Sequence, residues 1–175
     1  MSTLEYLNTD VCCIGKVHPV WNCGTTPYSV TQASTKARLL VQRYGITSSY
    51  TAGKTMRDTC PLCNIESETM QHFLIKCEAL EDIRSPLMSK ITTALQEVNT
   101  RPLTVQTILD PSIHTELEPE TRDYIESLTR RLCHELHSTR SVLIKRQCDN
   151  RSRNDFVPKP TLVTVVRQME VAETT

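Results

Sequence analysis

Apolar residues recur at helical spacing in two long segments of this 175-residue chain. The first stripe predicts a helix that Gly45 would end, and its members are Val30, Ala33, Ala37, Leu40, Val41 and Tyr44. The second stripe clusters within about 60° of a helical wheel over more than four turns, and its members are Ile125, Leu128, Leu132, Leu136 and Leu143. Both stripes predict amphipathic helices, so the fold class is expected to be mostly α.

Shorter elements are expected between these helices. Ser85 and Pro86 form a cap and first-turn pair, which predicts a helix with a buried stripe of Leu87, Ile91, Ala94, Leu95 and Val98. Prolines divide residues 101–120 into a short helix near 105–109 and an acidic connector. We therefore expect an irregular N-terminal segment over 1–29, a small helical domain over 30–147, and a disordered tail over 148–175, with flexibility at both ends.

Charge falls into three blocks along a chain that is neutral overall, with 20 Lys plus Arg and 20 Asp plus Glu. Residues 1–59 carry six cations and three anions, residues 60–128 carry five and twelve, and residues 129–175 carry nine and five. The net charges are +3, −7 and +4. One extended basic surface is not expected, although the two cationic ends could converge in space on a polyanion.

The interpretation of the cysteines depends on the cellular compartment of the protein. No stretch approaches the roughly 18 consecutive apolar residues of a membrane-spanning helix, and residues 1–10 lack the basic and apolar regions of a signal peptide. We therefore expect an intracellular protein, in the nucleus or the cytoplasm, with no membrane partner. In a reducing compartment, clustered cysteines are more often metal ligands or reactive thiols than disulfides.

Four soft ligands lie within 18 residues: Cys60, Cys63, His72 and Cys77. Zn²⁺ prefers four tetrahedral donors, which thiolate sulfur and neutral imidazole nitrogen supply. Packing of the thiols in an apolar core is the alternative, but residues 64–71 between them are polar. The spacing therefore predicts one structural zinc ion in a CCHC knuckle over residues 60–77, with no open position for water or substrate.

The last two ligands are five residues apart, which an ideal α-helix does not accommodate. Five residues rotate by about 500°, or 140° net, so His72 and Cys77 would diverge on a regular helix. We expect the helix to begin near Thr69 and to distort or end near Cys77.

The other cysteines and histidines give weaker signals. Cys133 lies about 100° around the helix from the face of His134 and His137, so a shared metal is not expected there. That face, with Arg130, is opposite the leucine stripe and is either a solvated basic face or a surface that contacts phosphates. The cysteines without a ligand-spaced histidine stay unassigned; they are Cys12, Cys13, Cys23 and Cys148.

Three segments together resemble the C-terminal region of animal non-LTR retrotransposon polyproteins. They are Thr35–Tyr44, the knuckle with Cys60-Pro61-Leu62-Cys63, Glu68-Thr69, His72-Phe73-Leu74 and Cys77, and Arg130–Cys133 with Leu136-His137 and Arg140. The resemblance covers about residues 30–146. It implies that the four knuckle residues bind zinc and that the knuckle helps a reverse transcriptase hold its RNA template or target DNA.

Catalysis is not expected of this chain. A polymerase core needs an Asp-Asp turn that holds two Mg²⁺, and the sequence contains no Asp-Asp pair. The residues before Val30 are too few for the upstream endonuclease of that family. No nucleophile and base signature is found, so we expect a binding protein rather than an enzyme.

These observations predict a non-catalytic domain that binds RNA or single-stranded DNA. The candidate phosphate contacts are Lys36, Arg38, Arg43, Lys76, Arg130 and Arg140. Phe73 and Leu62 are either an apolar platform for bases or part of the core. Two alternatives stay open: a zinc-stabilised helical module that binds a protein partner, which the acidic middle favours, and a nonfunctional retrotransposon-derived fragment.

Overall fold

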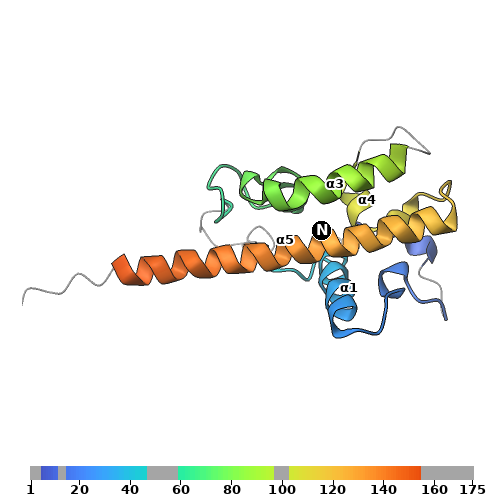
Figure 1. Ribbon diagram of the computed structural model, residues 1–175, viewed down its shortest axis with the longest axis horizontal. Helices are drawn as coiled ribbons and strands as arrows, with labels where there is room; N and C mark the ends of the chain where they lie inside the picture. The colour runs from blue at the N-terminus through green and yellow to red at the C-terminus, as the bar shows by residue number, and fades with distance from the viewer. Residues whose placement is uncertain (1–4, 12–14, 47–58, 97–102, 155–175) are drawn as a thin grey trace, which may run out of the picture. The chain divides into compact units, whose positions relative to one another are not determined.

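The structure is a computed structural model that describes residues 5–11, 15–46, 59–96 and 103–154 (Figure 1). Over these residues the protein is a mostly helical small domain without a β-sheet, as predicted, and its β pairing is limited to an isolated bridge between Thr59 and Ser67. The α-helices are α1 (Pro27–Leu40), α3 (Glu81–Gln96), α4 (Val105–Leu109) and α5 (Pro119–Asn154). The chain divides into two compact units at Leu143, and every contact described below lies in the first unit.

Helix α1 begins before the predicted stripe and ends earlier. The Thr26 side chain accepts a hydrogen bond from the backbone N–H of Ser29 at 3.2 Å, and Pro27 occupies the first turn, where its missing N–H costs nothing. The helix stops at Leu40, because Gln42 adopts a left-handed conformation with a φ of 52°. Gln42, rather than the predicted Gly45, therefore ends the regular helix.

Helix α3 also starts earlier than predicted. Pro86 was expected in the first turn, but it lies inside the helix, which begins at Glu81. A proline there removes the hydrogen bond to the carbonyl four residues earlier, that of Asp82. Figure 1 shows α3 beside the first turns of α5, and residues of both helices line one open hollow; they include Ser89, Thr93, Thr121 and Tyr124.

Helix α5 extends beyond the predicted domain boundary at residue 147. It continues to Asn154, so residues 148–154 are helical rather than part of a tail. The remaining expected ends, residues 1–4 and 155–175, lie outside the described residues. None of the helices in the described ranges has the length and apolar character needed to cross a membrane.

Four members of the predicted leucine stripe of α5 are buried, namely Ile125, Leu128, Leu132 and Leu136, whereas Leu143 is half-buried. The buried surface of the helix extends around from this stripe, where α1 and the N-terminal segment contact it. Buried residues there are Glu126, Thr129, Arg130 and Cys133. The prediction of a solvated basic face is therefore wrong at Arg130.

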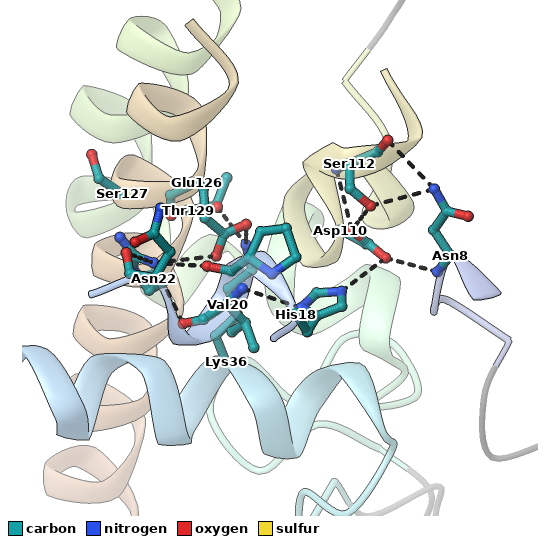
Figure 2. A network of polar contacts seen from close by, with 12 residues as sticks. Asn8, His18, Val20, Asn22, Lys36, Asp110, Ser112, Glu126, Ser127 and Thr129 are labelled. Carbon is teal, nitrogen blue, oxygen red and sulfur yellow. Dashed lines mark hydrogen bonds and ion pairs between the residues drawn. The ribbon is translucent and has the colours of Figure 1, made fainter. Parts of the chain in front are cut away.

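In its described residues before α1, which are 5–11 and 15–26, the N-terminal segment lacks α-helix but is held in place, and α1 begins at Pro27, within the segment 1–29 that was predicted to be irregular. It contains two short 3₁₀ turns, η1 (Thr9–Val11) and η2 (Pro19–Trp21). Figure 2 shows the contacts that hold it. Nη1 of Arg130 lies 3.2, 3.4 and 2.9 Å from the carbonyl oxygens of Pro19, Val20 and Asn22.

A second anchor is the buried carboxylate of Asp110 (Figure 2). It accepts from the backbone N–H of Asn8 at 2.7 Å and from Ser112 Oγ at 2.5 Å, and it lies 3.4 Å from His18 Nε2. Burial alone would raise the pKa of Asp110, but the hydrogen bonds from His18, Ser112 and Asn8 outweigh it and lower the pKa. The ionised carboxylate thus connects the N-terminal segment to the turn after α4.

Candidate metal centre

The structure brings the four predicted ligands of the CCHC knuckle together. One ligand atom from each of Cys60, Cys63, His72 and Cys77 lies within 4.8 Å of all the others. The sulfurs of Cys60 and Cys77 are 3.9 Å apart, and Cys63 Sγ lies 3.3 Å from His72 Nε2. A tetrahedral ion with Zn–S bonds of about 2.3 Å separates two sulfurs by about 3.8 Å, so the cluster has the dimensions of a zinc site.

A tight turn positions the first two ligands. The N–H of Asn64 donates to the carbonyl of Cys60 at 2.9 Å, and the N–H of Cys60 donates to the carbonyl of Glu66 at 2.7 Å. Asn64 has a φ of 56°, a left-handed conformation that asparagine tolerates better than most residues. The bridge between Thr59 and Ser67 closes the loop behind this turn.

A π-helical turn positions the last two ligands. The turn, η3 (His72–Lys76), carries an i to i+5 hydrogen bond of 2.7 Å from the N–H of Cys77 to the carbonyl of His72. A π-turn is wider than an α-turn, so residues five apart return to the same side. This widening is the distortion that the five-residue spacing predicted, and it explains how His72 and Cys77 reach one ion.

The imidazole of His72 is oriented by neighbouring polar groups. Its Nδ1 lies 3.4 Å from a carboxylate oxygen of Glu66, and its Nε2 faces Cys63. A proton on Nδ1, shared with the carboxylate, leaves the Nε2 lone pair for a metal. Thr69 Oγ1 accepts from the backbone N–H of His72 at 3.0 Å and fixes the start of the turn. Thr69 was predicted near the start of this helix, whereas Glu66 was not identified from the sequence, because a carboxylate partner of a histidine has no fixed spacing.

The three thiols differ in the direction in which the protein shifts their pKa values. Burial raises the pKa of Cys60 and raises that of Cys77 to about 12. For Cys63, burial also acts to raise the pKa, but hydrogen bonds from the backbone of Ile65 and Glu66 reverse this and lower it. Metal binding must therefore displace protons from the two buried thiols, so metal affinity should fall at low pH.

Two arginines lie against the cluster from outside. The Nη2 of Arg84, which is buried, donates to the carbonyl of Cys77 at 2.7 Å. The guanidinium of Arg140 forms a bidentate pair with Glu68, at 2.7 and 2.8 Å, and the hydrogen bonds and charge of Glu68 raise the pKa of Arg140. For Arg140, desolvation is the largest influence and acts in the opposite direction. Arg140 thus ties α5 to the loop that carries the ligands.

An aromatic stack joins α5, the segment that follows α1 and the π-turn beside the cluster. The rings of Tyr44 and Phe73 are stacked, with centroids 5.4 Å apart. The hydroxyl of Tyr44 lies 2.6 Å from His137 Nδ1, and the guanidinium of Arg140 lies 5.9 Å from the Tyr44 ring centre. The knuckle is therefore part of the domain core.

The donor set decides what the site can do. Three thiolates and one imidazole suit Zn²⁺, and four protein ligands leave no position for a substrate. The residues thus form a Cys₃His cluster that could hold one metal ion in a closed, structural site. Among the described residues it is the one group of this kind; Cys133 is buried apart from it, with a pKa raised to about 12 by desolvation, and Cys12 and Cys13 lie outside the described residues.

Three of the six residues that were predicted to contact phosphates make contacts within the protein instead. Lys36 and Arg130 are buried, and Arg140 is paired with Glu68, so the prediction that they face a ligand is wrong for this fold. Arg38, Arg43 and Lys76 are exposed. Phe73, which was left open as platform or core, is buried and belongs to the core, and Leu62 is half-buried.

A serine, an aspartate and a histidine also meet near the N-terminal segment, but not as a catalytic triad. Asp110 lies between Ser112 and His18, so the histidine does not face the serine hydroxyl. His18 Nδ1 accepts a hydrogen bond from the backbone N–H of Val20 at 3.1 Å and is not available as a base. This cluster anchors the N-terminal segment.

Comparisons of the chain with protein-family models, with curated proteins and with solved structures give no match. The function therefore has to be argued from the cluster and from the surface around it.

Proposed function

We propose that the protein is a zinc-stabilised helical domain that binds RNA or single-stranded DNA without catalysing a reaction. Zinc in the Cys₃His cluster holds the knuckle loop, the π-turn and, through Glu68 and Arg140, helix α5 in one arrangement. The metal has a structural role, and exposed side chains bind the ligand. The proposal agrees with the resemblance of residues 30–146 to the C-terminal region of non-LTR retrotransposon polyproteins.

The observation that carries the proposal is the position of the three exposed cations. Arg43 adjoins Tyr44, and Lys76 ends the π-turn that contains Phe73, so both flank the aromatic stack from different segments. Arg38 lies near His137, whose pKa its charge helps to lower. Cations from two parts of the chain, residues 38–43 and the π-turn, thus adjoin residues of the aromatic stack beside the cluster, and a phosphate backbone could contact them.

The local charge also favours a polyanion over an acidic or neutral partner. Residues 11–57 contain no Asp or Glu and six cations: Lys16, Lys36, Arg38, Arg43, Lys54 and Arg57. The acidic block that favours a protein partner lies later in the chain, over residues 60–128. A partner that contacts the acid-free segment therefore meets positive charge although the protein as a whole is neutral.

The test is the binding of zinc-loaded full-length protein to a labelled single strand over a range of salt concentrations. Each phosphate neutralised on a single strand contributes about −0.7 to the slope of log affinity against log salt, so three contacts predict a slope of about −2. Replacement of Lys76 by Gln should flatten the slope by about 0.7. Lys90→Gln is the matched control, because Lys90 is an exposed lysine on α3, and it should leave the slope unchanged.

Failure to bind RNA or DNA at low salt would refute the proposal and leave the interaction module or the nonfunctional fragment. Equal slopes for the Lys76 and Lys90 variants would show that the cations beside the cluster are not the contacts.

A further inference from the structure

Four exposed apolar side chains lie within residues 17–30, in the N-terminal segment and the first turn of α1, whereas the knuckle exposes Ile65. Val17, Trp21, Tyr28 and Val30 are 75, 46, 56 and 44 % exposed. Trp21 and Tyr28 are the two aromatic residues among them, whereas Phe73 of the knuckle is buried. A surface for planar groups is therefore found at residues 21–28.

Helix α5 holds both aromatic residues in fixed positions. Trp21 lies between Val20 and Asn22, whose carbonyls contact the guanidinium of Arg130 (Figure 2), and its own N–H donates to the carbonyl of His18 at 2.9 Å. The backbone that presents the indole is thus restrained by several hydrogen bonds. A restrained aromatic side chain loses little conformational entropy when it binds a partner.

The Tyr28 ring packs edge-on against the imidazole of His134, with centroids 5.3 Å apart and planes at 88°. His134 is four residues after Arg130, so the two residues of α5 that contact Tyr28 and the backbone around Trp21 are about 6 Å apart along the helix axis. The other side of each ring is available, since both residues are about half exposed. The exposed side of each ring can accordingly receive a planar group.

The segment that carries the two rings has exposed cations and no acidic residues. Lys16 and Arg38 are exposed on the acid-free segment. The acidic residues of α5 nearest to Arg130 are paired, since Glu126 is buried against Lys36 and Glu135 pairs with Arg131 at 2.6 Å, whereas Asp123, two turns before Arg130, is exposed. The surface therefore fits an anionic partner.

From these observations we infer that Trp21 and Tyr28 are a stacking platform for the bases of single-stranded nucleic acid. A single strand supplies flat rings at regular intervals, each with a phosphate, and so matches both the aromatic residues and the cations. An acidic peptide would satisfy the charge but would leave the rings without stacking partners. The inference rests on the proposed function and deepens it, because it moves the base contacts from the knuckle to residues 21–28.

The chain contains a single tryptophan, so its fluorescence reports on Trp21 alone. Zinc-loaded full-length protein is titrated with a uridine homopolymer of about ten nucleotides, while anisotropy of a labelled copy measures binding in parallel. Stacking of a base on the indole should quench the fluorescence, and the quenching should saturate at the concentration at which binding saturates. Binding without any change in Trp21 fluorescence would overturn the platform and leave the proposed function intact.

A matched pair of tyrosines gives a second test. Tyr28→Ala removes a ring that is 56 % exposed, and Tyr124→Ala removes one that is 51 % exposed at the start of α5. The Tyr28 variant should bind between about fivefold and a hundredfold more weakly, with an unchanged salt slope because no charge is lost. Tyr124→Ala should bind as the parent does.

For the indole, Trp21→Phe should keep most of the affinity, whereas Trp21→Ala should lose it by a factor similar to that of Tyr28→Ala. Zinc content and helical circular dichroism establish that each variant is folded. Equal affinities for Tyr28→Ala and Tyr124→Ala would contradict the platform. Absence of binding by the parent protein would refute the proposed function and the platform together.

Discussion

The amine of Lys36 on α1 lies 2.6 Å from a carboxylate oxygen of Glu126 on α5, and their side chains are only 0 and 2 % exposed. The amine also lies 2.7 Å from Thr129 Oγ1, so it has two acceptors within the buried contact (Figure 2). A lysine is seldom buried so completely unless it is paired. This ion pair fixes where α1 crosses α5.

We predict that Lys36→Met destabilises the domain by about 3 to 5 kcal/mol, because it leaves the Glu126 carboxylate buried without its partner. Arg38→Met, two residues further along the same helix but exposed, should stay within about 0.5 kcal/mol. Urea denaturation of the zinc-loaded protein measures both. The double variant Lys36→Met, Glu126→Leu should recover part of the loss, since apolar side chains replace the buried pair and Arg130 keeps the carbonyls of residues 19, 20 and 22 as partners. Similar stabilities for the two single variants would mean that Lys36 is not buried.

The second prediction concerns the orientation of His72. Glu66→Gln should lower zinc affinity by about 10- to 100-fold, because the carboxylate holds the ring with Nε2 toward the cluster. The fold should persist at saturating zinc, since the Glu66 side chain is 54 % exposed. Competition with a chromophoric chelator measures the affinity. Glu78→Gln, an exposed glutamate beside Cys77, is the control and should bind zinc as the parent does.

The third prediction concerns the contact between α5 and the knuckle loop. Arg140→Gln removes the bidentate partner of Glu68, whose carboxylate is buried with only 1 % of its side chain exposed. We therefore expect the free energy of unfolding, measured by denaturation, to fall by about 2 to 5 kcal/mol. Arg140→Lys should restore only part of it, because an ammonium group does not match the two oxygens as a planar guanidinium does. Full recovery by lysine would show that charge alone, without the bidentate geometry, is sufficient.

The fourth prediction is a titration. Burial and the charges of His134, Arg140 and Arg38 lower the pKa of His137 below its usual value of about 6.5. A histidine with a lowered pKa stabilises the fold above the unfolded pKa, and this stability is lost as the pH falls from about 6.5 through the folded pKa. NMR of the imidazole protons measures the shift directly. In Arg38→Gln the pKa of His137 should rise, because a nearby cation has been removed; a pKa at or above 6.5 in the parent would contradict the burial of this ring.

The metal cluster could be predicted from the sequence because its four ligands lie close together along the chain. Four ligands within 18 residues already define the donor set, and the five-residue gap between His72 and Cys77 already demanded a distorted helix. The structure supplies that distortion as the π-turn. The hydrophobic stripe of α5 was local information too, and Ile125, Leu132 and Leu136 are buried as predicted.

The predictions that failed concern polar residues whose partners are distant in the sequence. Lys36 and Arg130 are cations of the kind that usually face solvent. They are buried here because Lys36 pairs with Glu126 and Arg130 donates hydrogen bonds to the carbonyls of residues 19, 20 and 22. Glu126 lies 90 residues after Lys36, and no periodicity within one helix reveals such a pair. For the same reason the sequence did not show that Arg140 pairs with Glu68, because Glu68 belongs to the knuckle loop, far from Arg140 in the sequence.

The most direct test of the account is the metal content of the folded chain. Native mass spectrometry of protein purified without chelator should show one zinc ion per chain, and Cys63→Ser should show none, whereas Cys148→Ser should keep it. Zinc binding is worth roughly 10 to 16 kcal/mol, which exceeds the net stability of a small domain, so chelation should unfold at least the region of residues 60–80 in hydrogen exchange. A metal-free chain that retains full protection of this region would contradict the account.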